Sequence, residues 1–511
     1  MSVQRNVIAN FLSSGWTAFI GLAMLPVYLR YLGIESYGLI GFFVSLQTWL
    51  SLLDMGLTPT LNREMARFSA GLHTPQGIRN LLRSMEVIYA AVAIALALAL
   101  AFGASWIATG WLNLQALAPR TATHALALMA LVIGIQWLGT LYRSAVLGLQ
   151  DQVWLSAVTA ILASVRALGT VIVLALVSPT IVAFVVFQCV TSLAETLLLA
   201  WRVRRLLPRP PAPPGFDLQA LREVRRFAAG ITVITILATL LTQVDKLLLA
   251  KLLPLDQFGY FSLAVAVAGA LSVLIGPINN AAYPRLSELA GTGSEQALAQ
   301  EYHRFAQLLS VAMLPATLFL SVFSYRIVLL WTGSADTAQQ VAPIVSVWAI
   351  GTALNGLNHV PYAAQLAHGW SRLTIVVNTV TLALMVPATL WLVPRHGAIA
   401  AAWIWVAINM GYIVFSIGIM HLRILKAEKW RWYLQDVLAP LVPSLLVVLA
   451  MWALHAPLEP MSRTGELGFL AVTLVLATFA ALLSTPVGIT LLRTMRMPLT
   501  PVTLRRRDDQ S

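Results

Sequence analysis

The 511-residue sequence has few charged side chains, and this shortage excludes most soluble folds. Only 10% of its residues are Asp, Glu, Lys or Arg, whereas 59% are hydrophobic, and the mean hydropathy is +0.80. A soluble domain carries about 25% charged residues, because it must cover its surface with polar groups. We therefore expect this chain to fold in a bilayer rather than in water.

Cysteine and enzyme motifs are also scarce. Cys189 is the single cysteine, which excludes an intrachain disulfide framework and any cysteine-rich metal site. The sequence has neither a phosphate-cradling Gly-x-x-x-x-Gly-Lys nor a His-Glu-x-x-His motif. We expect no enzymatic activity and no cofactor. Any transport would draw energy from a gradient, a partner or mass action, with Na⁺ and H⁺ both open as coupling ions.

Long apolar runs fill most of the chain. A spanning helix needs roughly 20 mainly apolar residues, and we find about fourteen such segments. They include residues 7–29, 36–56 and 227–252, and a turn at Ser178-Pro179 separates two others, since proline and the residue before it resist continuing a helix. The sequence predicts an all-α, polytopic membrane protein.

Basic residues gather in alternate connections, as the positive-inside bias requires. One group surrounds the break LPRPPAPPG between Arg202 and Arg226, and another lies in the tail from Arg493 to Arg507. We expect both groups, and both termini, on the cytoplasmic side of a bacterial inner membrane. The net charge of +13 then reflects membrane topology, and no nucleic acid partner is expected.

The two halves of the chain repeat. Arg30 to Gly38 matches Lys251 to Gly259, with base, acid, aromatic residue and glycine at corresponding places, and Arg63 matches Arg285. Each half then holds six spans of the same orientation, related by an axis along the membrane normal, an arrangement that suits alternating access. We predict an N-terminal six-helix lobe (1–202), a cytoplasmic linker (203–226), a second six-helix lobe (227–424), two additional helices (425–492) and a basic tail (493–511).

Ionisable residues inside the spans are candidate site residues, because burying charge in hydrocarbon is costly. Arg166 lies in mid-span, where it is either a cation facing a cavity or the ion-pair partner of Glu195. Glu195 could counter Arg143 instead. Asp245 and Lys246 either line the cavity or pair between helices, and Lys246 could also reach outward to the interface.

Other charged residues lie at span ends. Arg30, at the outer end of the first span, has the position of an interfacial anchor, and Asp54, which ends the second span, has that of a structural residue.

Several motifs in order resemble one family. They are Tyr31–Leu39, Leu53–Leu57 followed by Arg63-Glu64, Gly148–Gln150, Asp245–Leu249, Phe258–Ala264 and Pro284–Ser287. Over residues 5–425 the chain resembles the polysaccharide flippases of the multidrug/oligosaccharidyl-lipid/polysaccharide (MOP) exporter superfamily, which include O-antigen and exopolysaccharide repeat-unit translocators.

This resemblance implies a two-lobed bundle of fourteen helices that moves a polyprenyl-pyrophosphate-linked oligosaccharide across the inner membrane through a cationic cavity. A glycan polymerase and a chain-length regulator are the implied protein partners. Arg166, Lys246 and Arg30 become candidate pyrophosphate ligands, and Asp245 and Glu195 candidate counterions or coupling acids. Asp54, Arg63 and Arg285 belong to motifs for gating or structure.

Three alternatives stay open. A cation-coupled multidrug antiporter of the same superfamily would prefer a cavity dominated by carboxylates, whereas the spans here carry more Arg and Lys near mid-depth. A flippase for a peptidoglycan precursor would be chemically almost the same. A membrane glycan polymerase, from another class, would normally need a sizeable outer loop or paired acidic residues at a membrane surface.

Overall fold

The computed structural model describes residues 3–54, 56–209, 211–218, 239–240, 242–455 and 461–496. Within these ranges the regular structure is helical. Most of the predicted span 227–252 and most of the predicted tail lie outside the described residues, although residues 242–252 are helical. The prediction of an all-α membrane protein is confirmed by twelve described helices that are long and apolar enough to cross a bilayer.

The first of these helices covers two predicted spans. Helical structure continues through α1 (Val3–Leu50), but Gly33 has φ 77° and divides it. Such a φ is open to glycine because it lacks a Cβ. Predicted spans 7–29 and 36–56 therefore meet at a sharp kink, and the total of fourteen spans stays a prediction.

The chain divides into two compact units. The first comprises Met1–Ala270, Trp331–Ile344 and Asn378–Ile404, and the second Leu271–Leu330, Val345–Val377 and Trp405–Ser511. Helix α8 (Leu255–Gly269) thus groups with the N-terminal helices. The predicted lobe boundaries stay predictions.

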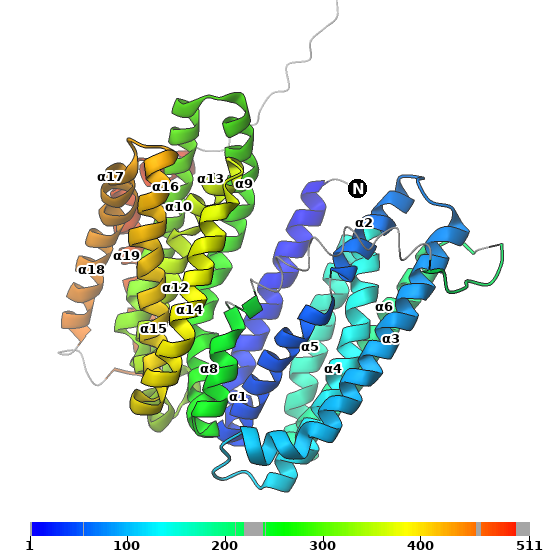
Figure 1. Cartoon of the computed structure of the whole chain (residues 1–511). Coiled ribbons are helices and arrows are strands. Elements are labelled where there is room, and N and C mark those ends of the chain that lie inside the picture. The colour runs from blue at the N-terminus through cyan, green and yellow to red at the C-terminus, as the bar shows by residue number, and fades with distance from the viewer. Residues whose placement is uncertain are drawn as a thin grey trace, which may run out of the picture. The chain divides into compact units, whose positions relative to one another are not determined.

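The N-terminal helices of the first unit form a bundle, coloured blue to cyan-green in Figure 1. After α1 they are η1 (Ser51–Asp54), α2 (Leu57–Ser69), α3 (Pro75–Trp106), η2 (Ile107–Trp111), α4 (Pro119–Gly148), α5 (Gln152–Leu176) and α6 (Ile181–Leu206). The turn predicted at Ser178-Pro179 separates α5 from α6, and the Thr180 side chain accepts a hydrogen bond from the Ala183 N–H at 3.3 Å. This N-cap satisfies one of the donors that a helix start leaves without an intrahelical partner.

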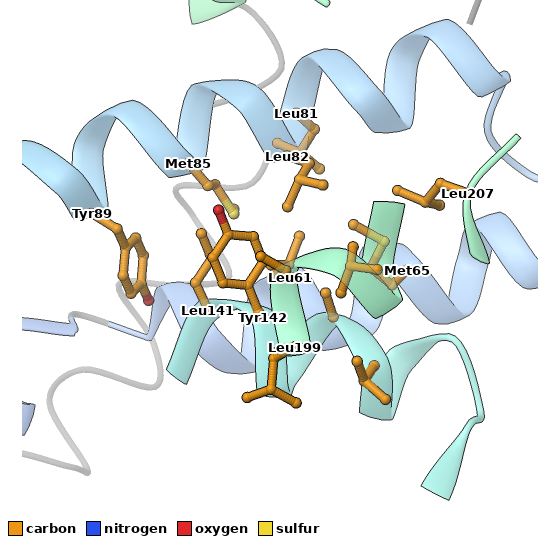
Figure 2. Close-up of a cluster of buried hydrophobic side chains, with 14 of the residues drawn as sticks. Leu61, Met65, Leu81, Leu82, Met85, Tyr89, Leu141, Tyr142, Leu199 and Leu207 are labelled. Carbon is orange, nitrogen blue, oxygen red and sulfur yellow. The ribbon is translucent and has the colours of Figure 1, made fainter. Parts of the chain in front are cut away.

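The short helix α2 is held by a buried apolar cluster. Leu61 and Met65 on α2 are fully buried against Leu82 and Met85 of α3 and Leu141 of α4 (Figure 2). A Cβ at Gly148, which ends α4, would come within 3.0 Å of the Asn62 backbone oxygen. Glycine at this position therefore permits α2 to approach α4.

Repeat-related glycines meet where α1 crosses α8. A Cβ at Gly38 would come within 3.0 Å of the Leu255 backbone oxygen, and a Cβ at Gly259 would come equally close to that of Ile34. The alignment of the two halves pairs Gly38 with Gly259 and Ile34 with Leu255. Each helix therefore presents the same surface to the other, as expected at a two-fold axis.

The second unit contains the C-terminal helices, together with parts of α12 (Ala335–Leu357), α14 (Ser371–His396) and α15 (Ala398–Gly411). Its other helices are η3 (Ala270–Leu274, from its second residue on), α9 (Ile275–Thr292), α10 (Glu295–Val322), α11 (Ser324–Thr332, up to Leu330), α13 (His359–Ala367), η4 (Tyr412–Ser416), α16 (Ile417–Arg423), α17 (Lys429–Arg431), η5 (Trp432–Leu438), α18 (Ala439–His455), α19 (Arg463–Leu483) and α20 (Pro486–Arg496).

Two polar clamps fix the C-terminal helices to α10 and α11. Near the start of α10, buried His303 contacts Asp436 through Nδ1 and Glu428 through Nε2, the latter at 2.9 Å. Beyond the other end of α10, His455 Nε2 lies 3.0 Å from Glu466 Oε1, and Arg326 Nε lies 3.9 Å from the same oxygen. Buried polar groups need such partners in a water-poor interior.

We expect Gly38→Ala to destabilise the protein, because the added methyl group collides with backbone rather than with a flexible side chain. Overpacking of this kind typically costs about 1–3 kcal/mol, and Gly259→Ala should cost a similar amount. The measurement is the apparent Tm of the purified protein in detergent. Gly21→Ala is the control, because a Cβ there meets nothing within 4 Å; a Gly38→Ala variant that melts no earlier than this control contradicts the prediction.

Candidate functional site

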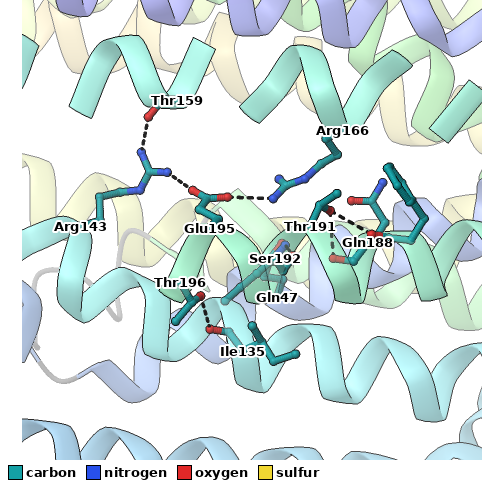
Figure 3. A network of polar contacts seen from close by, with 12 residues as sticks. Gln47, Ile135, Arg143, Thr159, Arg166, Gln188, Thr191, Ser192, Glu195 and Thr196 are labelled. Atoms are coloured by element: carbon teal, nitrogen blue, oxygen red, sulfur yellow. Dashed lines mark hydrogen bonds and ion pairs between the residues drawn. The ribbon is translucent and has the colours of Figure 1, made fainter. Parts of the chain in front are cut away.

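A cluster of three charged side chains lies among α4, α5 and α6 (Figure 3). Glu195 on α6 accepts a hydrogen bond from Arg166 Nη2 on α5 at 2.8 Å through Oε2. Its other oxygen, Oε1, accepts from Arg143 Nη2 on α4. The Arg143 Nη1 atom also donates to Thr159 Oγ1 at 3.1 Å. One carboxylate therefore ties three helices together.

This cluster carries an excess positive charge. Two guanidinium groups share one carboxylate, and Arg stays protonated in proteins. The three side chains are only 17–37% exposed. The buried Arg166 Nε has no acceptor among the described residues. The cluster therefore retains both a net positive charge and an N–H donor that an anion could use.

The expected pairing of Arg166 with Glu195 is thus present, and Arg143 adds to it. The sequence leaves Arg166 open between an ion pair and a cation for an anionic group. In the structure Arg166 forms the ion pair. Because two guanidinium groups share one carboxylate, the cluster also keeps one uncompensated positive charge. The role of either residue in binding a substrate stays a prediction.

A chain of amides continues the polar interior beside this cluster. Gln47 on α1 donates to Gln136 on α4, and Gln136 Nε2 donates to Ser192 Oγ on α6 at 2.9 Å. Ser192 lies one helical turn before Glu195 on the same helix. Gln47, Gln136 and Asp54 also line a pocket of about 260 Å³. Polar groups therefore extend through the apolar bundle from Asp54 to Glu195.

Asp54 fastens the start of α2. Its carboxylate accepts hydrogen bonds from the Thr58 N–H at 3.1 Å, from the Thr58 hydroxyl and from the Tyr89 hydroxyl on α3. These contacts fit the expected structural role, and they leave Asp54 on the wall of the pocket.

Asp245 and Lys246 lie on the helix of residues 242–252. Lys246 Nζ donates to Gln243 Oε1 at 3.2 Å. Asp245 Oδ1 is buried and accepts no hydrogen bond from the described residues. The backbone oxygen of Gln243 accepts from Trp49 Nε1 on α1 at 3.2 Å, so this helix is joined to α1. A buried carboxylate oxygen without a donor is costly unless a proton or cation reaches it.

Arg30 lines a separate and larger pocket of about 650 Å³ in the first unit. Its walls include Tyr31, Thr332 at the end of α11, and Ser334 and Thr337 around the start of α12. This position is compatible with an interfacial anchor and with a ligand contact.

Arg63 on α2 and Arg285 on α9 are both exposed. Arg63 Nε lies 3.7 Å from the buried Glu64, and Arg285 Nη1 lies 2.8 Å from Glu288, one turn further along α9. These two repeat-related arginines therefore make local ion pairs. Among the candidate residues, Arg166 and Glu195 form an ion pair between two helices.

Glu35 is a structural residue that the sequence alone did not reveal. Its carboxylate accepts hydrogen bonds from the backbone N–H groups of Gln115, Ala116 and Leu117 at 2.6–2.7 Å. The sequence does show an acidic residue between the kink at Gly33 and the helix crossing at Gly38. Nothing in it identifies the loop of Gln115 to Leu117 as the hydrogen-bond donor to this carboxylate. The described residues contain no cluster of His, Cys, Asp and Glu suited to a metal ion.

Comparison with known proteins gives two family matches. Residues 3–290 match the family described as polysaccharide biosynthesis protein. Residues 231–391 match the MatE family. A protein of Shigella flexneri, described as a candidate O-antigen transporter, is 21% identical over 405 residues, covering 79% of this chain and 94% of the relative.

Solved structures share the fold at low sequence identity. The lipid II flippase MurJ, in an inward closed conformation, has a TM-score of 0.68 and 12% identity, and the match covers 97% of this chain and 100% of MurJ. A multidrug resistance MATE family transporter in an inward-facing conformation has a TM-score of 0.62 and 12% identity, covering 81% of this chain and 96% of that one. These likenesses show that the chain shares the fold of these two transporters.

Glu195→Gln should destabilise the first unit, because it leaves two guanidinium groups without their shared carboxylate. Removing one partner of a buried pair costs about 3–5 kcal/mol, and the partial exposure here favours the lower end of that range. Adding Arg143→Gln should recover part of the loss by removing one uncompensated charge. A double-mutant cycle on apparent Tm tests this, and purely additive losses would contradict the shared-carboxylate geometry.

Proposed function

Since the chain belongs to the polysaccharide biosynthesis protein family, we propose that it is a flippase that moves a lipid-linked oligosaccharide from one leaflet of the bilayer to the other. The observation that carries this proposal is the Arg143–Glu195–Arg166 cluster, in which an excess positive charge lies among membrane-spanning helices. An anion that passes through a membrane protein needs such a partner, because hydrocarbon offers none.

The proposed substrate is an oligosaccharide joined to a polyprenyl pyrophosphate, as an O-antigen or exopolysaccharide repeat unit would be. A pyrophosphate is a compact anion, and guanidinium groups bind phosphate oxygens through charge-assisted hydrogen bonds. Arg166 supplies the first contact in this proposal, Lys246 the second and Arg30 the third. The polyprenyl tail would stay in the bilayer. The relative described as a candidate O-antigen transporter supports this class of substrate.

The proposed cycle is alternating access, driven by an ion gradient. The repeat-related contact of Gly38 with Gly259 supports two matching halves, which is an architecture used for alternating access. Asp245 is the proposed coupling acid, because its buried oxygen would accept a proton or Na⁺. Both termini are proposed to be cytoplasmic, with a glycan polymerase and a chain-length regulator receiving the product.

Arg166→Gln should reduce translocation strongly while leaving the protein folded. The change removes the surplus charge, yet Glu195 keeps its ion pair with Arg143. Loss of one charge-assisted contact in a low-dielectric site corresponds to about a tenfold or larger drop in rate. The measurement is transfer of a lipid-linked oligosaccharide between leaflets of reconstituted vesicles. Arg304→Gln is the control, because Arg304 is exposed and pairs only with Glu301 among the described residues.

The same vesicle assay distinguishes the proposed flippase from a glycan polymerase and from a drug antiporter. A wild-type protein that lengthens glycan chains without moving them would be a polymerase. One that exports organic cations instead would be a drug antiporter. Either result contradicts the proposal, as does normal translocation by Arg166→Gln at equal protein content.

Lys246→Ala should lower translocation without preventing membrane insertion. The hydrogen-bond partner of Lys246 Nζ among the described residues is the neutral Gln243, so the change breaks no ion pair between helices. Lys251→Gln is the matched control on the same helix, where Nζ donates to the Gly110 backbone oxygen at 2.6 Å. Equal transport rates in the two variants would remove Lys246 from the site.

A further inference from the structure

The linker after α6 lies along α3 and is fastened to it. Three polar side chains spaced one turn apart on α3 accept hydrogen bonds from linker N–H groups. Gln76 accepts from Ala212 at 3.1 Å, Asn80 from Gly215 at 3.1 Å and Ser84 from Asp217 at 2.7 Å. The described part of the linker is therefore a fixed element of the first unit. It forms one wall of a pocket.

This pocket has a volume of about 240 Å³ and is lined by Arg79, Leu82, Arg83, Glu86, Arg204 and Pro214. A water molecule occupies about 30 Å³ in the liquid, so the pocket has room for a larger polar group. Three guanidinium groups and one carboxylate line it, which gives a net charge of plus two.

The three arginines differ in how firmly they are held. Arg79 donates from Nε to the Pro208 backbone oxygen at 3.0 Å and from Nη2 to that of Leu207 at 2.6 Å. It is therefore fixed against the end of α6. Arg83 Nη1 and Arg204 Nη2 lie 3.3 and 3.8 Å from Glu86 and are 54% and 62% exposed. Exposed pairs of this kind contribute little, so both groups can turn toward a stronger anion.

Glu86 would still have a hydrogen-bond partner if Arg83 and Arg204 turned toward an anion. Its Oε1 accepts a hydrogen bond from the Tyr142 hydroxyl on α4 at 2.9 Å, and its side chain is 12% exposed. Glu86 therefore keeps a neutral hydrogen-bond partner when the arginines turn away, although the Tyr142 hydroxyl also contacts Arg204.

The depth of the pocket indicates a lipid ligand. Trp201 precedes Arg204 by one turn of α6, is 49% exposed and is covered by the Arg205 guanidinium at 5.3 Å from its ring centre. Exposed tryptophans at the ends of spans mark the headgroup level of the bilayer. Basic pockets at this level bind anionic headgroups.

We propose that Arg79, Arg83 and Arg204 form a binding site for the phosphate of a lipid headgroup. Arg79 supplies a preoriented charge, and Arg83 and Arg204 close on the phosphate oxygens by exchanging their weak contacts with Glu86 for charge-assisted ones. Two lipids offer this chemistry: an anionic phospholipid of the membrane, and the pyrophosphate-linked carrier before it is translocated. The site does not depend on flippase activity, because phospholipid would be held in the same way.

The test is lipid binding to the purified full-length protein, measured by native mass spectrometry with phosphatidylglycerol, polyprenyl pyrophosphate and neutral phosphatidylcholine. The pocket variant is Arg83→Gln/Arg204→Gln, with Arg79 kept because it holds the end of α6. The control is Arg304→Gln/Arg493→Gln, which removes the same charge at two exposed positions elsewhere. The affinity of the pocket variant for an anionic lipid should fall about tenfold or more, as expected for losing charged hydrogen bonds.

Comparing the binding of phosphatidylglycerol with that of polyprenyl pyrophosphate identifies the lipid. A loss confined to phosphatidylglycerol assigns the site to membrane phospholipid, and a loss confined to polyprenyl pyrophosphate assigns it to the carrier. The proposal is overturned if the pocket and control variants bind both lipids equally. It is also overturned if inorganic pyrophosphate binds the wild type as tightly as either lipid, since the site would then hold a soluble anion.

A second pair, Arg83→Lys/Arg204→Lys, keeps the charge and removes the planar fork of donors. It covers the case in which the glutamine pair does not fold. Several-fold weaker binding of the anionic lipid is expected, and unchanged binding contradicts phosphate recognition by these arginines. None of these outcomes depends on translocation, so a failure here leaves the flippase proposal standing.

Discussion

Hydrocarbon offers no partner to a charge, and this constraint organises the interior of the N-terminal bundle. Glu195 satisfies it for two arginines at once and thereby joins α4, α5 and α6. The amide chain from Gln47 to Ser192 meets the same requirement without charge. Because each of these polar groups is committed to a partner on another helix, the polar interior determines how the helices pack as well as what the bundle could bind.

Much of the fold could be predicted because its signals are local. Apolar runs long enough to span a bilayer are visible in the sequence, and a proline such as Pro179 marks a helix boundary without knowledge of any distant contact. The candidate site was predictable to the same extent. Arg166 and Glu195 are conspicuous inside apolar runs, so their pairing is among the alternatives that the sequence leaves open.

The remaining features depend on contacts between residues far apart in the chain. The acceptor role of Glu35 could not be predicted, since its three donors lie in a loop about eighty residues away. The same holds for His303, whose partners Glu428 and Asp436 belong to the C-terminal helices. For Glu195 the sequence offers Arg143 and Arg166 as alternative partners, and only the packing of α4 and α5 against α6 shows that it pairs with both.

The crossing of α1 and α8 has a consequence for the origin of the chain. A surface that fits its own copy about a two-fold axis would also join two separate half-length chains. A single-lobed ancestor could therefore have paired with itself through the stretch that is now Ile34–Gly38, before fusion made the pairing intramolecular. Glu35 and its counterpart Asp256 make different contacts, whereas the glycines of the shared contact leave room for the facing backbone on both sides.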